Sequence, residues 1–177
     1  MNHTTSSPPG WAEERWEICV DETEVHELLC RCDVHTARRY GTPVPQRDPQ
    51  TTTRRVRTCC VHALRRSAGL AAMFTLTWQP PFAQDAAVFP AAQKPGYLSR
   101  LAVAPELLSQ GTLLGARCVR RALEVAAEAG ADVLRCEANP DLTATLELLL
   151  RLGFRQAGST LDDGAGVRRV HLQARAA

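Results

Sequence analysis

The sequence predicts an α/β fold, in which helices cover both faces of a mixed sheet as a three-layer α/β/α sandwich. Two observations support this prediction. Short apolar segments bounded by Gly or Pro alternate with longer amphipathic segments, and the chain closes on two strand-like segments in succession. At 177 residues a single domain is the default. We therefore expect a disordered polar tail over residues 1–12 and one domain over residues 13–177.

The N-terminal half begins with a short strand, Trp16–Val20, and continues into a helix over residues 22–40. Asp21 is placed to cap that helix, and the Pro-containing segment Gly41–Pro45 ends it. Residues 51–57 are consistent with a short second helix. The inward-facing positions expected on the first helix are Val25, Leu28, Leu29, Cys32 and Val34.

A β-hairpin is expected next, with strands over residues 59–65 and 70–79 around a turn at Gly69. Residues 80–96 contain four Pro and form a long loop. Its aromatic residues, Phe82 and Phe89, are expected to pin the loop to the core, and the alternative is that they face a substrate.

The second half alternates strands and helices before the closing pair of strands. The strands are expected over residues 97–104, 132–138, 154–159 and 166–174, and the helices over residues 111–129 and 142–152. Val119, Ala122, Leu123, Val125 and Ala126 are the expected inner side of the longer helix. Gly130 is its expected C-cap, and the final turn falls at Asp162–Gly166.

Composition argues against several functional classes. The net charge of +2 is too small to suggest a nucleic-acid partner or an anionic membrane surface. Residues 1–10 lack the apolar core of a signal peptide, and no apolar run is long enough to span a bilayer. Seven cysteines in such a chain indicate free thiols in the reducing cytoplasm.

The segment from Tyr97 to Gly130 carries the strongest functional signal. A strand ends at Pro105, and the turn Gln110–Gly115 then opens a long helix. Free backbone N–H groups at the positive end of a helix dipole bind anions, phosphates above all. A P-loop needs Lys and Ser or Thr after its Gly, but Gly115 is followed by Ala and Arg. A dinucleotide site needs Gly-x-Gly-x-x-Gly, which is absent.

The same segment resembles motif A of the GNAT acyltransferases, in which Val-x-Pro precedes Arg/Gln-x-x-Gly-x-Gly/Ala at a helix start. Leu101–Pro105 and Gln110–Gly115 match that order. The resemblance continues through the strand, the Asn139-Pro140 turn, the next helix and Leu152-Gly-Phe154. It covers residues 16–174 in element order, with its specific motifs between residues 97 and 154.

The resemblance implies a GNAT-like fold whose sheet splays centrally, acetyl-CoA or another acyl-CoA as donor, and a small-molecule or peptide amine as acceptor. It implies backbone pairing of the pantetheine arm with the strand, an oxyanion-binding N–H at Val103, and pyrophosphate binding by the turn. The cofactor-binding residues so implied are Leu101, Ala102, Val103, Gln110, Gly111, Thr112, Leu113, Leu114, Gly115 and Ala116.

The chain departs from the family pattern at three places. Leu113 stands where the middle Gly is usual, and Pro105 and Gln110 are two residues further apart than usual. An alternative anchor on Pro105 and Gly111 removes that gap, but the helix length from Gly115 to Gly130 favours the first anchor. Leu149 occupies the position of the family's Tyr, which protonates the departing thiolate.

Acyl transfer needs a neutral amine, stabilisation of an oxyanion and a proton for the thiolate. The candidate catalytic residues are Ser99, which can hold a water, His62, Glu137 and Asn139. Each is also an ordinary strand or turn residue by position. His171 is a weaker candidate, and Cys136 lacks the neighbouring His of an activated nucleophile.

Other polar clusters favour structural interpretations. The residues His26, Cys30, Cys32 and His35 resemble a zinc site only faintly. On a helix His26 and Cys30 share a face while Cys32 points elsewhere, so no metal is expected. Arg117 or Arg120 is placed to reach the 3′-phosphate of CoA.

Three functions therefore stay open at the level of sequence. The first is acetyl transfer from acetyl-CoA to an amine. The second is a catalytically degenerate CoA-binding sensor or partner protein of the same fold, which Leu113 and Leu149 would suit. The third is related chemistry on an unusual acceptor. The sequence also allows a homodimer.

Overall fold

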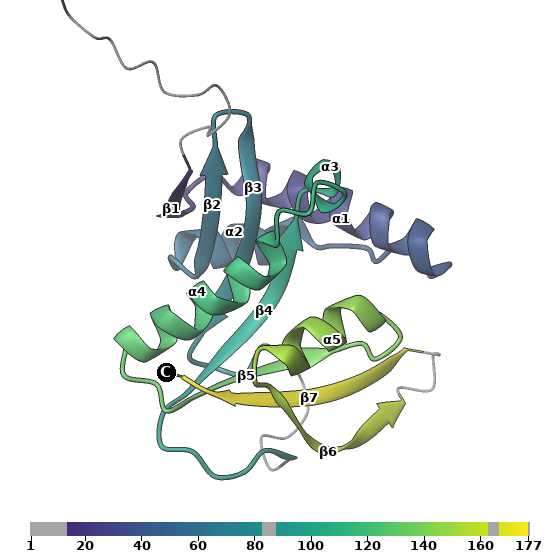
Figure 1. The fold of residues 1–177 in the computed structure, drawn as a ribbon. Coiled ribbons are helices and arrows are strands. Elements are labelled where there is room, and N and C mark those ends of the chain that lie inside the picture. The colour runs from purple at the N-terminus through teal and green to yellow at the C-terminus, as the bar shows by residue number, and fades with distance from the viewer. Residues whose placement is uncertain (1–13, 83–87, 163–166, 177) are drawn as a thin grey trace, which may run out of the picture.

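The computed structural model describes residues 14–82, 88–162 and 167–176, and its strands form a mixed sheet in the order β1-β2-β3-β4-β5-β7-β6 (Figure 1). The strands are β1 (Arg15–Ile18), β2 (Val61–Arg66), β3 (Gly69–Thr77), β4 (Pro95–Val103), β5 (Val133–Ala138), β6 (Arg155–Asp162) and β7 (Arg168–Arg175). The helices are α1 (Glu22–Tyr40), α2 (Pro49–Arg57), α3 (Pro105–Leu108), α4 (Leu114–Glu128) and α5 (Thr143–Arg151).

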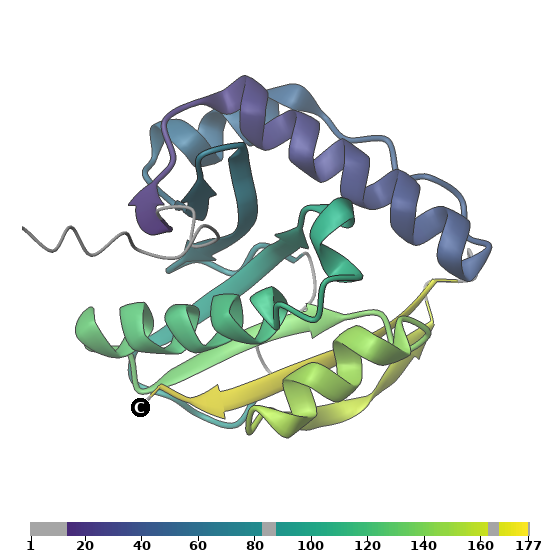
Figure 2. The ribbon, with the colours of Figure 1, turned by 45° about the horizontal axis from the view of Figure 1, so that its top comes forward.

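Helices lie on both faces of the sheet, so the predicted three-layer α/β/α fold is confirmed. The two cores are separate: α1 and α2 pack on one face through Val25, Leu28 and Val56, and α4 and α5 pack on the other through Val119 and Leu149. Figure 2 shows α1 along the top of the view and α4 and α5 in front of the strands. β2, β3 and β4 contribute side chains to both cores, whereas β5 and β7 contribute to the α4–α5 core alone.

The sheet parts between β4 and β5, its one parallel pair among the described strands. These strands pair only from Pro95 opposite Val133 to Leu98 opposite Cys136, although β4 continues to Val103. Beyond Leu98, β4 stays with β3, and β5 stays with β7 (Figures 1 and 2). We call this divergence the β4–β5 fork.

A β-bulge in β4 lies at the start of the fork. Ser99 pairs with Thr75 and Ala102 pairs with Met73, so two residues of β4 stand opposite one residue of β3. Arg100 in this bulge has a φ of 53°, which is uncommon for a residue with a side chain. Bulges bend a strand and increase its twist, and this one turns the end of β4 away from β5.

The helix signals at the N-terminus are confirmed. The Asp21 side chain accepts a hydrogen bond from the Glu24 N–H at 2.9 Å, and Gly41 ends α1 with a φ of 67°. Asp48 caps α2, which begins with Pro49 at its first position. Cys32 and Val34 on α1 are only partly buried, unlike the other three residues expected to face inward.

The loop between β3 and β4 covers the sheet face that α1 and α2 leave open. Phe89 is buried against the His171 ring, 5.3 Å between centroids, and Phe82 packs on Tyr97 and His171. Arg135 donates a hydrogen bond to the Pro90 carbonyl at 2.6 Å. The two Phe side chains therefore pin the loop to the core, as predicted.

The main difference from the expected fold lies after β4. Pro105 begins a one-turn helix, α3, because its fixed φ suits the first helical position. The expected helix over residues 111–129 begins later, at Leu114. The expected tail of residues 1–12 and most of the Asp162–Gly166 turn lie outside the described residues. Among the described residues, no helix is long and apolar enough to cross a membrane.

Glu24 joins α1 to the sheet, and its replacement tests this link. Its carboxylate accepts two hydrogen bonds from Arg65, at 3.0 and 2.7 Å, and one from the Leu70 N–H. We expect Glu24→Gln to lower the free energy of unfolding by about 1–2 kcal/mol in urea denaturation. The control Glu22→Gln removes an exposed contact with Arg57 and should cost less than about 0.5 kcal/mol. Equal losses would contradict a structural role for the Glu24 contacts.

Candidate active site

A cavity of about 240 Å³ lies in the β4–β5 fork. Its lining comes from helices on opposite faces of the sheet, which is possible only because the strands have parted there. The lining residues are Cys32, His35 and Thr36 of α1, Leu101, Ala102 and Val103 of β4, Pro105 and Leu108 of α3, Gly115 of α4, and Ala144, Thr145 and Leu148 of α5.

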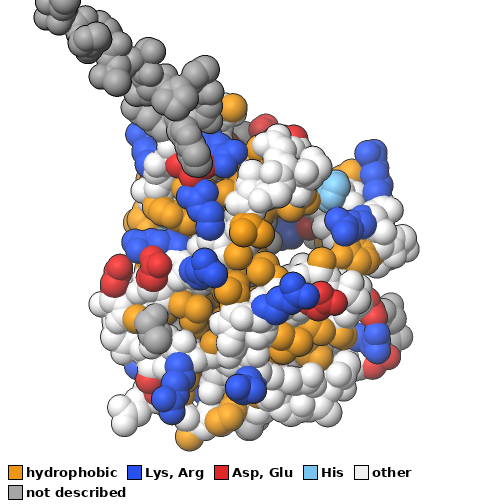
Figure 3. All heavy atoms as spheres, in the orientation of Figure 1, with side chains coloured by type: hydrophobic (Ala, Val, Ile, Leu, Met, Phe, Trp, Pro, Cys, Tyr) orange, Lys and Arg blue, Asp and Glu red, His pale blue; other side chains and the backbone are white. Residues whose placement is uncertain are grey.

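A second cavity, of about 390 Å³, adjoins the first at the start of α4. Val103, Leu108, Gly115, Ala144 and Leu148 line both, so the two form one groove from the turn before α4 into the fork. The second cavity also includes Gly111 to Leu114, Ala116, Glu147 and Arg151. Figure 3 shows the surface hollowed between α3 and α5, with hydrophobic side chains gathered along α4 and α5.

The start of α4 leaves several backbone N–H groups available to this groove. The helix has no capping side chain and no acidic residue in its first turn. Its first internal bond runs from the Arg117 N–H to the Leu113 carbonyl at 3.0 Å. The N–H groups of Leu114, Gly115 and Ala116 therefore have no acceptor within the helix. The Gln110 N–H is different, because it donates to the Leu107 carbonyl at 3.2 Å.

Leu113 adopts the backbone conformation of the Gly it stands in for. Its φ of 50° and ψ of 25° lie in the left-handed region, which residues with a Cβ rarely adopt. The side chain is 75% exposed, so it lies at the rim of the second cavity, which it helps to line. The left-handed turn is thus retained at a local cost of about 1–2 kcal/mol.

Gly115 sets the distance between α4 and α5. A Cβ built on Gly115 would stand 3.1 Å from a terminal carbon of Leu148, tighter than ordinary packing. The missing side chain therefore keeps the groove open at the point where the two cavities join.

The end of β4 directs backbone groups into the fork. The Ala104 N–H donates to the Ala71 carbonyl of β3 at 2.9 Å, and alternation along the strand turns Leu101 and Val103 the other way. The Cys32 thiol donates to the Val103 carbonyl at 3.2 Å. Burial raises the pKa of Cys32 to about 11, so this residue remains a thiol at neutral pH.

Ser99 and Glu137 are the first residues past the last β4–β5 pair. The Tyr97 hydroxyl accepts a hydrogen bond from Arg135 at 3.4 Å, so Tyr97 and Arg135 share the face opposite α4 and α5. Two residues further along each strand, Ser99 and Glu137 occupy the same face. The hydroxyls of Ser99 and its neighbour Thr75 are buried without a hydrogen bond among the described residues.

Glu137 lies beside a histidine that sequence reasoning ranked low. Its carboxylate accepts a hydrogen bond from Arg169 at 2.6 Å and lies 3.5 Å from the His171 Nε2. His171 is fully buried, and neither ring nitrogen makes a hydrogen bond among the described residues. The antiparallel pairing of Glu137 with His171 produces this contact, and that register is not readable from sequence.

The structure does not bring His62 or Cys136 to the groove. His62 stacks on Phe74 under α4, 4.9 Å between centroids, and burial together with the nearby Arg121 lowers its pKa. His62, a catalytic candidate from sequence, faces the α4 side two strands away from β4 and lines neither cavity of the groove. Burial raises the pKa of Cys136 to about 12, which leaves it inert as a nucleophile.

Asn139 occupies the turn after β5, where its side-chain oxygen accepts the Asp141 N–H at 2.9 Å. That hydrogen bond stabilises the turn that leads into α5. Elsewhere, the Cys30 thiol contacts His26 at 3.5 Å, and no group of three metal-ligating side chains occurs among the described residues. All seven cysteines are free.

Arg151 is the cation that the structure places at the groove. It lines the cavity at the start of α4, and its guanidinium is 80% exposed and 3.6 Å from Glu147. Of the two arginines proposed from sequence, Arg117 is paired with Glu14 at 2.6 Å, and neither Arg117 nor Arg120 lines the groove. Arg151 was missed because α5 meets α4 only in the folded chain.

Comparison with known families agrees with this geometry. The model of the acetyltransferase (GNAT) family matches residues 23–154, about three quarters of the chain. The chain belongs to the GNAT acetyltransferase family. Its matched region runs from α1 to the third residue after α5 and includes the whole groove.

Solved structures share the GNAT fold at low sequence identity. A GNAT-family acetyltransferase from Listeria monocytogenes has a TM-score of 0.71 at 17% identity, with 93% of this chain and 95% of that one covered. The yncA protein from Salmonella typhimurium, solved with its cofactor acetyl-CoA, has a TM-score of 0.64 at 14% identity, with 95% of both chains covered.

The ribosomal-protein-S18-alanine N-acetyltransferase from Escherichia coli has a TM-score of 0.63 at 14% identity, with 93% of this chain and 95% of that one covered. No curated protein sequence matches the chain.

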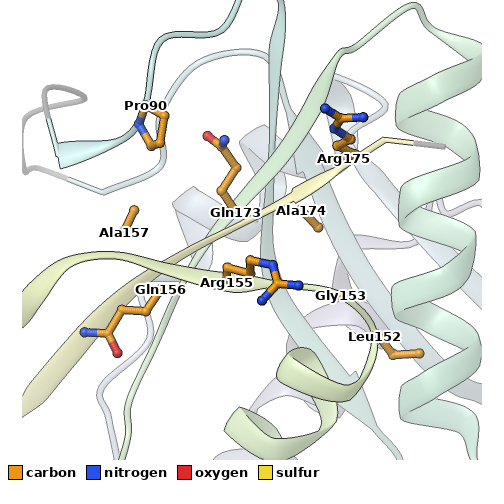
Figure 4. Close-up of a pocket in the computed structure, with 9 residues that line it drawn as sticks. All are labelled: Pro90, Leu152, Gly153, Arg155, Gln156, Ala157, Gln173, Ala174 and Arg175. Atoms are coloured by element: carbon orange, nitrogen blue, oxygen red, sulfur yellow. The ribbon is translucent and has the colours of Figure 1, made fainter.

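A larger cavity, of about 600 Å³, lies outside the GNAT groove at the β6–β7 edge (Figure 4). It shares no lining residue with the groove. Gln173 lies between Pro90 and the two strands in this view, and its side-chain oxygen accepts a hydrogen bond from Arg135 at 2.8 Å. This cavity therefore adjoins the loop packing described above and not the start of α4.

Substitution of Leu113 tests the left-handed turn of this GNAT protein. Glycine removes the cost of a positive φ but also enlarges the entropy of the unfolded chain. We expect Leu113→Gly to leave the free energy of unfolding unchanged or raise it by up to about 1 kcal/mol, measured in urea. The control is Leu150→Gly, an exposed position within α5, which should lose about 1 kcal/mol. Similar losses in both variants would contradict the strained turn.

Proposed function

We propose that this protein is an N-acyltransferase, which moves an acetyl group from acetyl-CoA to an amine by direct attack in a ternary complex. The continuous groove from the uncapped start of α4 into the β4–β5 fork is the observation that carries the proposal. It joins an anion-binding turn to unpaired strand edges, the two features that a phosphate-bearing thioester requires.

The residues at the groove fit acetyl-CoA. The free N–H groups of Leu114, Gly115 and Ala116 would hold the diphosphate, together with the turn at Gly111 to Leu113. Arg151 would face a phosphate from α5. Leu101, Ala102 and Val103 line the fork where the pantetheine arm would lie. Leu113 lines the rim of this cavity and is 75% exposed, so it leaves the cavity open to solvent.

Bound acetyl-CoA supplies an acetyl group activated as a thioester. The chain's own task is to orient the amine, accept its proton and stabilise negative charge on the acetyl oxygen. The Val103 N–H, turned into the fork, would stabilise that charge. Glu137 and Ser99, the first residues past the last β4–β5 pair, would take the proton, directly or through a water bound to Ser99. Asn139 would position the end of β5.

One observation favours the alternative of a catalytically degenerate CoA-binding sensor or partner protein. Leu149 is buried in the core on α5 and carries no proton to give a departing thiolate. A thiolate is nevertheless a fairly stable leaving group, so transfer can proceed without that donor. Measured turnover therefore decides between the two functions.

The acceptor is proposed as a small-molecule or peptide amine. The E. coli structural relative is named for an alanine of a ribosomal protein, which illustrates a peptide acceptor in this fold. A single domain over residues 13–177 and a cytoplasmic location complete the proposal, the latter supported by seven free cysteines. A homodimer is compatible with it.

Calorimetry with acetyl-CoA tests the groove directly. We expect stoichiometric binding by the unaltered chain, and Gly115→Val should weaken it at least about tenfold by moving Leu148 and narrowing the groove. The control Gly130→Ala places a side chain at a φ of 80° at the far end of α4. It should lower stability without changing the dissociation constant. No binding at about 1 mM acetyl-CoA would reject every CoA-based function.

Thiol release from acetyl-CoA with a panel of amines separates an enzyme from a sensor. We expect Glu137→Gln to lower kcat by about 10²–10⁴-fold, the usual contribution of a general base, while acetyl-CoA affinity stays unchanged. Glu124→Gln, an exposed site on α4, serves as the control and should keep full activity. Full activity in Glu137→Gln would rule out Glu137 as the base. Acetyl-CoA binding without turnover of any amine would favour the sensor.

A further inference from the structure

We propose that the acceptor is an amine that also carries a carboxylate, held by the guanidinium of Arg100 at the β4–β5 fork. This inference rests on the proposed acyl transfer and names the substrate class of the same site. It starts from the position of Arg100, one residue past Ser99 in the β4 bulge.

The bulge determines where Arg100 points. Its Nη1 donates to the hydroxyl of Thr52 on α2 at 3.3 Å, so the side chain lies on the α1–α2 face. Ser99 faces the same side, because the bulge places two consecutive side chains there. At the fork, the face opposite α4 and α5 therefore carries the side chains of Ser99, Arg100 and Glu137.

Arg100 is half-buried yet has no ion pair. Thr52 is its one hydrogen-bond partner, and no carboxylate of the described residues lies within 4.0 Å of its guanidinium. Desolvation, together with the positive charges of Arg47 and Arg55, lowers the pKa of Arg100. A partly buried cation without a counter-ion is costly, and a bound anion removes that cost.

The two carboxylates whose negative charge acts on Arg100, Asp33 and Asp48, are hydrogen-bonded to other groups. Asp33 accepts a bidentate pair from Arg47, and Asp48 accepts the Gln50 and Thr51 N–H groups and the Thr51 hydroxyl as the cap of α2. Arg55, part-buried on α2, makes no ion pair with a described residue either. Arg55 and Arg100 therefore give this part of the acceptor face an uncompensated positive charge.

This charge selects among amines. A simple cationic amine would be repelled, whereas a carboxylate would pair with the planar guanidinium of Arg100 through charge-assisted hydrogen bonds. Arg100 is adjacent to Ser99, so the carboxylate and the attacking nitrogen must be close together in the acceptor. The chemistry therefore fits a compact amino acid.

Matched pairs of acceptors test the inference. Amino acids, β-alanine and γ-aminobutyrate are each compared with the corresponding amide, which keeps the amine but loses the negative charge. We expect kcat/KM, followed by thiol release from acetyl-CoA, to favour the carboxylates by at least about tenfold. Calorimetry on the protein saturated with CoA should show the same preference in binding.

Three variants separate recognition from support of the fold. Arg100→Gln should remove the preference for carboxylates, mainly through KM, and Arg100→Lys should restore part of it. Thr52→Val removes the hydrogen bond between α2 and Arg100 but leaves the guanidinium, so the preference should survive. Arg54→Gln, at an exposed position of α2, should match the unaltered protein.

The outcomes distinguish this inference from the proposed function. Acetyl-CoA binding with equal or better use of amides would overturn the inference alone. Identical effects of Arg100→Gln and Thr52→Val on acceptor preference would assign Arg100 to structure and overturn it as well. No binding or turnover of any carboxylated amine at about 10 mM would also reject it. Loss of acetyl-CoA binding in the unaltered protein would instead reject the acyl-transfer proposal.

Discussion

The parting of β4 from β5 is the constraint on which the rest of the site depends. Neighbouring strands in a sheet satisfy each other's backbone N–H and C=O groups. Beyond Leu98, the edge of β4 that faces β5 therefore has no partner strand, although its other edge stays paired with β3. Residues from both faces then line one cavity, which a continuous sheet would prevent. The β4 bulge at Arg100 starts the divergence, and α1 and α5 complete the cavity walls. A ligand that pairs with a strand edge and carries phosphates would satisfy both the unpaired edge of β4 and the free N–H groups at the start of α4.

Backbone conformation, more than side-chain identity, preserves the phosphate end of the groove. Leu113 departs from the family's Gly, yet its left-handed backbone keeps the turn before α4 and its side chain points to solvent. Such strain persists when the surrounding structure fixes the chain. Here α3 before the turn and α4 after it hold both ends, with Gly115 allowing α5 to approach. A motif that binds through main-chain N–H groups can therefore tolerate changes in its side chains.

The two sides of the fork carry different chemistry. The α4–α5 side combines apolar lining with free N–H groups, whereas the α1–α2 side presents Ser99, Glu137 and the uncompensated Arg100. Glu137 accepts a hydrogen bond from Arg169 and lies 3.5 Å from the Nε2 of the buried His171. We infer from this division that donor and acceptor approach from opposite faces and meet where Leu98 and Cys136 end their pairing.

Local patterns were enough to predict the order of the elements apart from α3, the caps at Asp21 and Gly41, and the strand–turn–helix around Gln110–Gly115. Periodicity, capping and turn chemistry act over a few neighbouring residues. Ser99 and Glu137 were candidates by residue type, and both stand just past the last β4–β5 pair. Four features became visible only in the folded chain: His62 lies under α4, His171 meets Glu137, Arg151 reaches the groove, and Arg100 has no counter-ion among the described residues. Each of these depends on strand register, on a bulge or on helix packing. Those features are set by contacts between residues far apart in the chain, which local patterns do not encode.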